Sequence, residues 1–291
     1  MATIRVSDFT SFISAVTTSN ADVVLDSDLD ANGWTPQVTN WTCKSVDGGN
    51  HAIRNIQHTI SGGYALFRLT NNTGCTISNV KFLNLVLTPG APWGSDFIYG
   101  YAGTNTIKNC EFQGLIKTQR LLEGKIDLVS QCTFSCENGS YGTILYLNGV
   151  SSSVGHDVTV VDECYFDCHS GGDSSYFTNT VIDFSSADFA VVSNCYFKGY
   201  LKVPRNDTIT IDGVIHNCVI NVDFTGASTV TSFKIGTTAI ALSGTSLYNT
   251  SKIDSGLLVN AQTNLVGLSD TDLRYPGGLT AIPPTGFPLI V

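Results

Sequence analysis

A short pattern of apolar and polar positions recurs along the chain. Apolar residues stand at the first, fourth and sixth positions of each copy, so strand-like alternation links positions four and six, and position three interrupts it. We therefore expect the third residue to lie in a bend. The six copies are ISNVKF, IKNCEF, VSQCTF, VDECYF, VSNCYF and IHNCVI, beginning at Ile77, Ile107, Val129, Val161, Val192 and Ile215.

The spacing of the copies predicts the architecture. Their fourth residues are Val80, Cys110, Cys132, Cys164, Cys195 and Cys218, which gives steps of 30, 22, 32, 31 and 23 residues by subtraction. Repeats of this length are typical of solenoids in which each coil packs on the next. The sequence therefore predicts an all-β chain, a right-handed parallel β-helix with loops of variable length.

Asparagine dominates the bend position and favours a particular backbone geometry. It tolerates the left-handed conformation better than most residues, and stacked amides can hydrogen-bond from one coil to the next. We expect both features here. The bend residues are Asn79, Asn109, Asn194 and Asn217, with Gln131 and Glu163 as the exceptions.

The cysteines at position four are expected to point into the core as small apolar side chains, beside a column of phenylalanines. A row of thiols about 4.8 Å apart offers no tetrahedral cage, so we expect packing and no bound metal. Cys136 and Cys168 each follow a repeat phenylalanine by two residues, which makes them expected neighbours and the candidate pair for a disulfide. The predicted core column is Cys110, Cys132, Cys164, Cys195 and Cys218, with Phe82, Phe112, Phe134, Phe166 and Phe197 next to it.

Both ends of the chain differ from the repeats. Ser7 is a candidate N-cap, and Phe9, Phe12 and Val16 recur at helical spacing, so residues 1–35 are expected to form a capping helix and a first strand. The β-helix is expected over 36–265. The tail 266–291 combines prolines with apolar residues, among them Leu279, Ile282, Phe287 and Leu289. This tail either docks on a partner or folds back on its own solenoid.

Charge and composition restrict the partners. Only 13% of the residues are charged, about half the usual share, and the net charge is −9. Clustered basic side chains are scarce, so no nucleic-acid partner is expected. The first residues lack a signal-peptide pattern and no apolar run is long enough for a membrane span, which predicts synthesis in a cytoplasm and no membrane insertion. We expect no cofactor.

Two groups of residues are candidates for chemistry or recognition. Asp157 and Asp188 precede their repeat cysteines by seven residues and Asp212 precedes Cys218 by six, so they form either an acidic column that binds cations or catalyses hydrolysis, or a set of turn residues. The aromatic candidates for binding a saccharide or a partner are Trp93, Tyr99 and Tyr101 in one long loop, and Tyr165 and Tyr196 between the repeat Cys and Phe.

With this repeat, capping helix and tail, residues 5 to 265 resemble the pectate-lyase-shaped right-handed β-helix proteins of bacteriophages and prophages, including tailspikes, fibres and capsid-decorating proteins. The same solenoid supports enzymes, adhesins and scaffolds. Polygalacturonases carry an Asp-Asp pair that this chain lacks, and its VPRND stretch lacks the flanking arginines usual in pectate lyases.

The resemblance implies a non-enzymatic virion component for capsid decoration, a fibre or receptor attachment, located in the virion. Its implied partners are other virion proteins, further copies of the chain, with a trimer as one arrangement, and a host surface glycan. Two alternatives stay open. One is a polysaccharide hydrolase or lyase of the tailspike type, and the other is a saccharide-binding adhesin.

Overall fold

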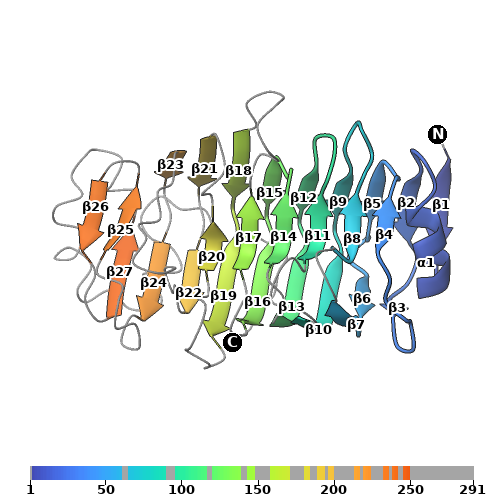
Figure 1. Cartoon of the computed structure of the whole chain (residues 1–291), viewed down its shortest axis with the longest axis horizontal. Coiled ribbons are helices and arrows are strands. Elements are labelled where there is room, and N and C mark those ends of the chain that lie inside the picture. The colour runs from blue at the N-terminus through green and yellow to red at the C-terminus, as the bar shows by residue number, and fades with distance from the viewer. Residues whose placement is uncertain are drawn as a thin grey trace.

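Parallel strands make up most of the chain (Figure 1). The computed structural model describes residues 2–60, 65–89, 96–116, 120–138, 143–147, 158–170, 180–183, 189–193, 196–199, 213–216, 219–223, 232–235, 238–241 and 245–249. Within these ranges α1 (Phe9–Val16) is the one α-helix. None of the described helices is long and apolar enough to cross a membrane.

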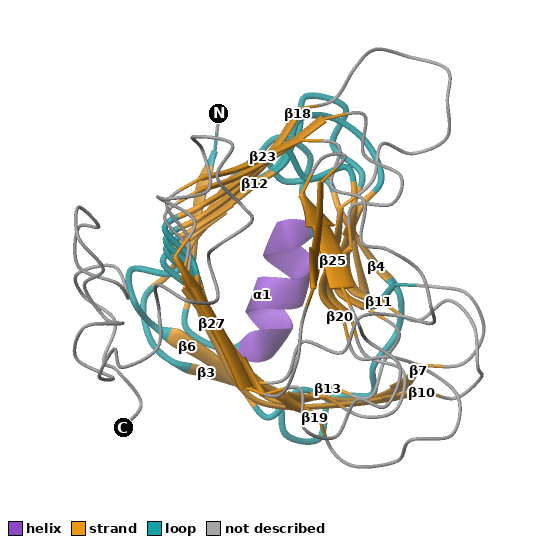
Figure 2. Ribbon diagram, turned by 90° about the vertical axis from the view of Figure 1, so that its left-hand side faces the viewer, coloured by secondary structure: helices purple, strands orange, loops and turns teal. Residues whose placement is uncertain are grey.

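Three parallel sheets surround a common interior (Figure 2). Sheet A contains β1 (Thr3–Val6), β2 (Asp22–Leu25), β5 (Ser45–Asp47), β9 (Thr76–Ser78), β12 (Thr106–Lys108), β15 (Leu128–Ser130), β18 (Val158–Asp162), β21 (Phe189–Ser193) and β23 (Gly213–His216). Sheet B contains β3 (Leu29–Asp30), β6 (Ala52–Arg54), β10 (Lys81–Pro89), β13 (Glu111–Ile116), β16 (Thr133–Asn138), β19 (Tyr165–Ser170), β22 (Tyr196–Gly199) and β24 (Val219–Asp223), with β7 (Gln57–Ile60) paired to β10. Sheet C contains β4 (Thr39–Trp41), β8 (Phe67–Leu69), β11 (Asp96–Gly100), β14 (Arg120–Gly124), β17 (Thr143–Leu147) and β20 (Thr180–Asp183).

The chain visits the sheets in rotation, as a solenoid does. From β9 in sheet A it passes to β10 in sheet B and β11 in sheet C, and then returns to sheet A at β12. Strands from successive coils pair in register, with Ile107 opposite both Ile77 and Val129. The parallel, mostly β architecture expected from the repeat is confirmed.

The parallel order ends after β24. Strand β27 (Thr245–Asn249) pairs with β24 in antiparallel fashion, and β25 (Ser232–Ile235) forms an antiparallel pair with β26 (Thr238–Ala241). These two strands, in the segment TSFKIGTTAIAL, lie within the range 36–265 expected for the β-helix, and they pair with each other. Only two residues separate them, which is enough for a hairpin but too short for a parallel crossover.

The helix α1 covers the N-terminal end of the interior (Figure 2). Its buried face consists of Phe9, Phe12, Ala15 and Val16, and the Phe12 ring lies 5.5 Å from the Trp41 ring. The N-cap is Asp8, one residue later than expected, because its carboxylate accepts the backbone N–H of Ser11 at 2.9 Å. This arrangement shields the apolar interior at the first coil from water.

The interior contains the predicted columns of cysteine and phenylalanine. Cys110, Cys132 and Cys164 are fully buried, and each thiol points to a backbone carbonyl of the preceding coil at 3.6 to 3.7 Å. The rings of Phe82, Phe112, Phe134 and Phe166 stack at centroid distances of 5.1, 5.1 and 4.8 Å. Cys195 and Cys218 lie outside the described residues.

The buried cysteines are free thiols that pack in the core. Burial raises the pKa of Cys110 and of Cys132 well above the usual range, so the nucleophilic thiolate is disfavoured. The described residues include no group of three or more metal-ligating side chains. Cys136 is a buried free thiol whose Cα pairs in register with that of Cys168, so the predicted neighbours are confirmed.

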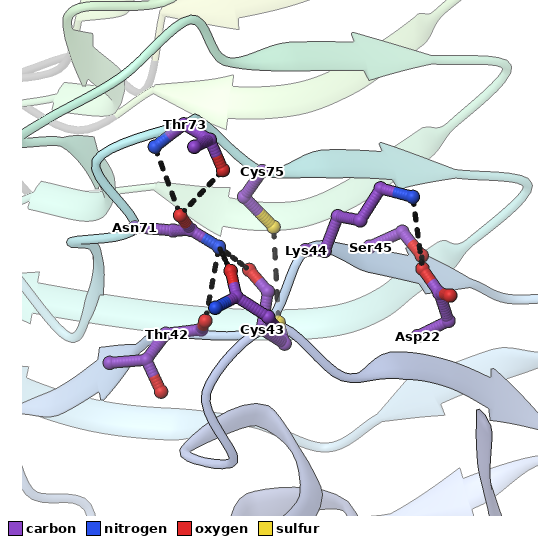
Figure 3. A network of polar contacts seen from close by, with 9 residues as sticks. Asp22, Thr42, Cys43, Lys44, Ser45, Asn71, Thr73 and Cys75 are labelled. Atoms are coloured by element: carbon purple, nitrogen blue, oxygen red, sulfur yellow. Dashed lines mark hydrogen bonds and ion pairs between the residues drawn. The ribbon is translucent and has the colours of Figure 1, made fainter. Parts of the chain in front are cut away.

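A second pair of thiols was not expected. The sulfurs of Cys43 and Cys75 lie 3.9 Å apart on adjacent coils, before β5 and β9 (Figure 3). The amide of Asn71 holds the same turn, since its Nδ2 donates to the backbone carbonyls of Thr42 and Cys43, both at 3.1 Å. Asn71 thus satisfies buried carbonyl groups where the chain turns toward sheet A.

The bend residues adopt the predicted left-handed conformation. Asn79, Asn109, Gln131 and Glu163 have φ values of 57°, 51°, 54° and 52°. Their side chains form a ladder along the corner between sheets A and B. Asn109 donates to Asn79 at 2.6 Å, Asn79 donates to Asp47 at 2.8 Å, and Gln131 donates to Glu163 at 2.8 Å. We refer to these five residues as the corner ladder.

A second ladder of side-chain hydrogen bonds runs across sheet B, and the sequence pattern did not predict it. Asn84 donates to Asn55 at 3.3 Å and Asn55 donates to Asp30 at 2.9 Å, and both asparagines have positive φ. Asn84 is the extra residue where the register between β10 and β13 shifts between Phe82 and Leu85. Because it lies outside the six-residue repeat, the repeat gave no signal for it.

The corner ladder can be tested at Asn109. We predict that Asn109→Ala lowers the free energy of unfolding by about 2 kcal/mol, because alanine disfavours positive φ and removes one hydrogen bond. Asn109→Gly keeps the backbone geometry and removes only the amide, so its loss should be close to 1 kcal/mol. Chemical denaturation measures both. Equal losses for the two variants would contradict a role for backbone geometry.

Candidate functional site

The outer face of sheet C carries the candidate functional site. Its strands β11 and β14 share one pattern, a polar residue, two buried apolar residues, a second polar residue and glycine, in DFIYG and RLLEG. The apolar residues Ile98 and Leu122 are fully buried and pair in register. Tyr99, the second polar residue of β11, is partly exposed and lies opposite Glu123 in the strand register, so the two side chains are neighbours on adjacent coils.

Strand register brings polar residues of three coils into one row. Tyr99 on β11 is in register with Arg68 on β8 and with Glu123 on β14. Adjacent strands are separated by about 4.8 Å, so these side chains are direct neighbours. Asp96 and Arg120 form a second pair in register, at the beginning of the same strands. The name sheet-C cluster is used below for six residues, Arg68, Asp96, Tyr99, Tyr101, Arg120 and Glu123.

Two carboxyl groups of the sheet-C cluster are buried together. Asp96 and Glu123 are 6% and 8% exposed. Burial raises the pKa of Asp96 well above its ordinary value, and a hydrogen bond with Glu123 and the negative charge of Glu123 raise it further. Oδ1 of Asp96 and Oε2 of Glu123 have no donor in the structure. Burial and the neighbouring carboxyl group therefore favour the protonated, neutral form of Asp96.

Arg120 holds the remaining charge of this pair. Its guanidinium forms an ion pair with Oε1 of Glu123, three residues along the same strand. The two side chains are 20% and 10% exposed, so this ion pair is largely shielded from water. Glu123 thus has a guanidinium partner, whereas Asp96 beside it is the carboxyl group whose pKa burial raises.

Two tyrosines and an arginine form the exposed part of the cluster. Tyr101 is 53% exposed, and the guanidinium carbon of Arg68 lies 4.7 Å from the centre of its ring. The Tyr99 ring lies 6.2 Å from the Tyr101 ring and is partly buried. Burial and the charge of Glu123 raise the pKa of Tyr99, so its phenol stays protonated. Together these residues offer aromatic surface, a cation and a hydroxyl group.

Glycine at the end of β11 allows this arrangement. A Cβ on Gly100 would lie 2.2 Å from the backbone oxygen of Lys125 on the next coil, which is too close for any other residue. The backbone N–H of Tyr101 donates to the carbonyl of Leu69 at 3.0 Å. The backbone on both sides of the Tyr101 side chain is thus fixed to the neighbouring coils.

The sequence-based candidates fall into three groups. Tyr99 and Tyr101 lie together on sheet C, and Trp93 from the same loop lies outside the described residues. Tyr165 and Tyr196 are register neighbours on β19 and β22, and Tyr165 is 6% exposed, which leaves little of its ring for a ligand. The acidic candidates Asp157, Asp188 and Asp212 and the tail residues Leu279, Ile282, Phe287 and Leu289 also lie outside the described residues.

Comparison with known proteins gives little further information. No protein-family model matches the chain, and no curated protein matches it. The crystal structure of a proposed immunoglobulin A1 protease from Bacteroides ovatus is similar, with a TM-score of 0.49 and 15% identity over 83% of this chain and 81% of that chain. A similarity of this size carries no information on activity.

The carboxyl pair predicts a specific dependence of stability on pH. Because the folded protein raises the pKa of Asp96, the stability associated with its neutral form is complete below the unfolded value of about 3.9 and is lost as the pH rises through the folded value. The free energy of unfolding should therefore fall above about pH 4, by up to about 1.4 kcal/mol per pH unit.

Asp96→Asn should remove this part of the pH dependence, because the amide donates a hydrogen bond to Glu123 without a titrating proton. The exposed Asp26→Asn is the matched control and should leave the slope unchanged. Urea denaturation from pH 4 to pH 9 measures the slopes. If Asp96→Asn and the parent protein show the same slope, the fold does not raise the pKa of Asp96.

Proposed function

We propose that this chain is a right-handed parallel β-helix that acts as a structural and attachment component of a phage-type virion, without enzymatic activity. The observation that carries the proposal is the coil stack itself, in which the same residue types recur at the same positions. Phe82, Phe112, Phe134 and Phe166 stack in one column, and the corner ladder follows one edge. Such a stack resists bending, as a projecting rod must.

The handedness follows from general rules of chain topology. Connections between parallel strands of one sheet are right-handed in about 98% of cases. Sheet A receives one strand from each coil, so each return to that sheet, such as the one from β9 to β12, is a connection of this kind. The low proportion of charged residues, 13%, fits a particle surface that is solvated mainly by hydroxyl and amide groups.

Attachment needs two surfaces with different roles, one that joins the particle and one that contacts the host. In this proposal the apolar tail, residues 266–291, joins other virion proteins or further copies of the chain, and the flank of the solenoid faces the host. The sheet-C cluster supports this division, because it presents Arg68 on β8 and Tyr101 directly after β11 on the flank of the rod.

Particle assembly tests the proposal. The full chain should co-purify with particles produced by the cell that makes it, and removal of residues 268–291 should abolish incorporation. Tyr101→Ala should be incorporated normally, since Tyr101 belongs to the flank. Quantitative immunoblotting of density-purified particles provides the measurement. A full chain that stays in the lysate and never enters particles would refute the proposal.

A second candidate function is hydrolysis of a polysaccharide by the acidic column expected from the sequence, Asp157, Asp188 and Asp212. Glycoside hydrolysis uses one protonated and one ionised carboxyl group, about 5 to 9.5 Å apart. Asp96 and Glu123 do not meet this requirement, because they are hydrogen-bonded to each other and are only 6% and 8% exposed.

Release of new reducing ends tests this second function. If the chain is a hydrolase, purified protein incubated with capsular and cell-wall glycans should release reducing ends, and Asp157→Asn or Asp188→Asn should reduce the rate at least about a hundredfold. Asp162→Asn, outside the acidic column, should leave the rate unchanged. Absence of reducing ends from every glycan would exclude hydrolysis and leave the structural role intact.

A further inference from the structure

We infer that the sheet-C cluster binds a saccharide that carries a carboxylate group, with Arg68 as the anion-binding residue and Tyr101 as the stacking surface. The inference rests on the proposed attachment function, and it names the class of ligand that the flank of the solenoid binds. It concerns binding and requires no bond to be broken.

The first argument is the charge that remains on the cluster. The cluster holds two guanidinium groups, of which Arg120 is ion-paired with Glu123 and Arg68 lies over the Tyr101 ring, and the raised pKa of Asp96 disfavours a second negative charge beside them. The whole chain carries −9. A local positive site on an acidic protein favours an anionic group over a cationic one.

The second argument concerns which of the two guanidinium groups is available. Arg120 is committed to Glu123. Among the described residues Arg68 has no carboxylate partner within ion-pair distance, and its guanidinium lies over the face of the Tyr101 ring. The proton on Asp96 matters here, because a second ionised carboxylate so close by would neutralise the cluster. Arg68 therefore keeps donors for a ligand, and its planar fork fits a carboxylate with two parallel hydrogen bonds.

The third argument concerns the rest of the ligand. Tyr101 is the exposed aromatic side chain of the described residues, and its ring lies at 6.2 Å and 52° from that of Tyr99. A sugar ring presents a flat C–H face to such an aromatic surface and hydroxyl groups at its rim. The phenol groups of Tyr99 and Tyr101 both donate and accept hydrogen bonds, which suits hydroxyl groups.

The site is also preorganised. Stacking on Arg68 limits the rotation of the Tyr101 side chain, while the backbone hydrogen bond to Leu69 and the glycine at position 100 fix its position. Side chains that are held before binding lose less conformational entropy when a ligand arrives. The row Arg68, Tyr99 and Glu123 spans three coils, which matches a ligand of several sugar units lying across the strands.

Calorimetry on the full-length protein with matched oligosaccharides tests the inference. Two pairs differ by the acidic sugar, sialyllactose against lactose and a hyaluronan tetrasaccharide against chitotetraose. At least one acidic member should bind more than about tenfold more tightly than its neutral partner, and its affinity should fall with added salt. Binding of neither acidic probe, or equal binding of acidic and neutral probes, would overturn the inference.

Variants locate the binding. Arg68→Gln should weaken binding of the acidic probe at least about tenfold, Arg68→Lys should restore part of it, and Tyr101→Ala should weaken it while Tyr101→Phe retains the stacking. Arg54→Gln, an exposed arginine on sheet B that is paired with Asp28, is the matched control and should bind like the parent protein. An unchanged affinity for Arg68→Gln would contradict the assignment.

A competition with inorganic phosphate identifies the anion. Millimolar phosphate should displace the acidic probe only weakly, since it lacks a face that stacks on Tyr101. Displacement as strong as that by the acidic saccharide would show a general anion site and overturn the saccharide assignment. The outcome is independent of particle assembly, because a chain that enters particles but binds no acidic sugar refutes this inference alone.

Discussion

Four successive coils pass a corner before their sheet-B strands where the backbone takes the left-handed conformation, at Asn79, Asn109, Gln131 and Glu163. At that residue the main-chain N–H turns to the next coil, as Asn79 donates to Lys108 at 3.2 Å and Asn109 to Ser130 at 2.9 Å. The following thiol then points inward and the phenylalanine two residues later joins the ring stack. A corner displaced by one residue would exchange the inward and outward side chains of the strand that follows.

The corner explains why the sequence revealed so much of the fold. The left-handed asparagine, the inward cysteine and the inward phenylalanine fall within a span of four residues, such as 109 to 112, so they appear as a local sequence pattern. The second ladder, at Asn55 and Asn84, was missed because it depends on a bulge that appears only when β10 and β13 are paired. The capping helix was predicted because its apolar spacing is local, and only its N-cap moved by one residue.

The sheet-C cluster was harder to predict for a related reason. Alignment of the coils on their repeat cysteines does not align Tyr99 with Glu123, because the loops from sheet C to sheet A differ in length. The shared pattern of DFIYG and RLLEG was the usable signal, and it sets both residues in one row. The raised pKa of Asp96 was beyond any sequence argument, since it follows from burial next to a carboxylate 27 residues away, 123 − 96, on another coil.

The direction of the hydrogen bonds in the corner ladder defines an interchangeable building block. Asn79 and Asn109 each donate toward the N-terminal end, and Asn79 also accepts from the coil that follows. A duplicated segment 80–109 would therefore join with every new amide paired, and the rod would lengthen by one spacing of about 4.8 Å. Between Gln131 and Glu163 the donor points the other way and ends on a carboxylate, which accepts but cannot donate. Gene duplication can thus extend the solenoid from its middle coils more readily than across this reversal.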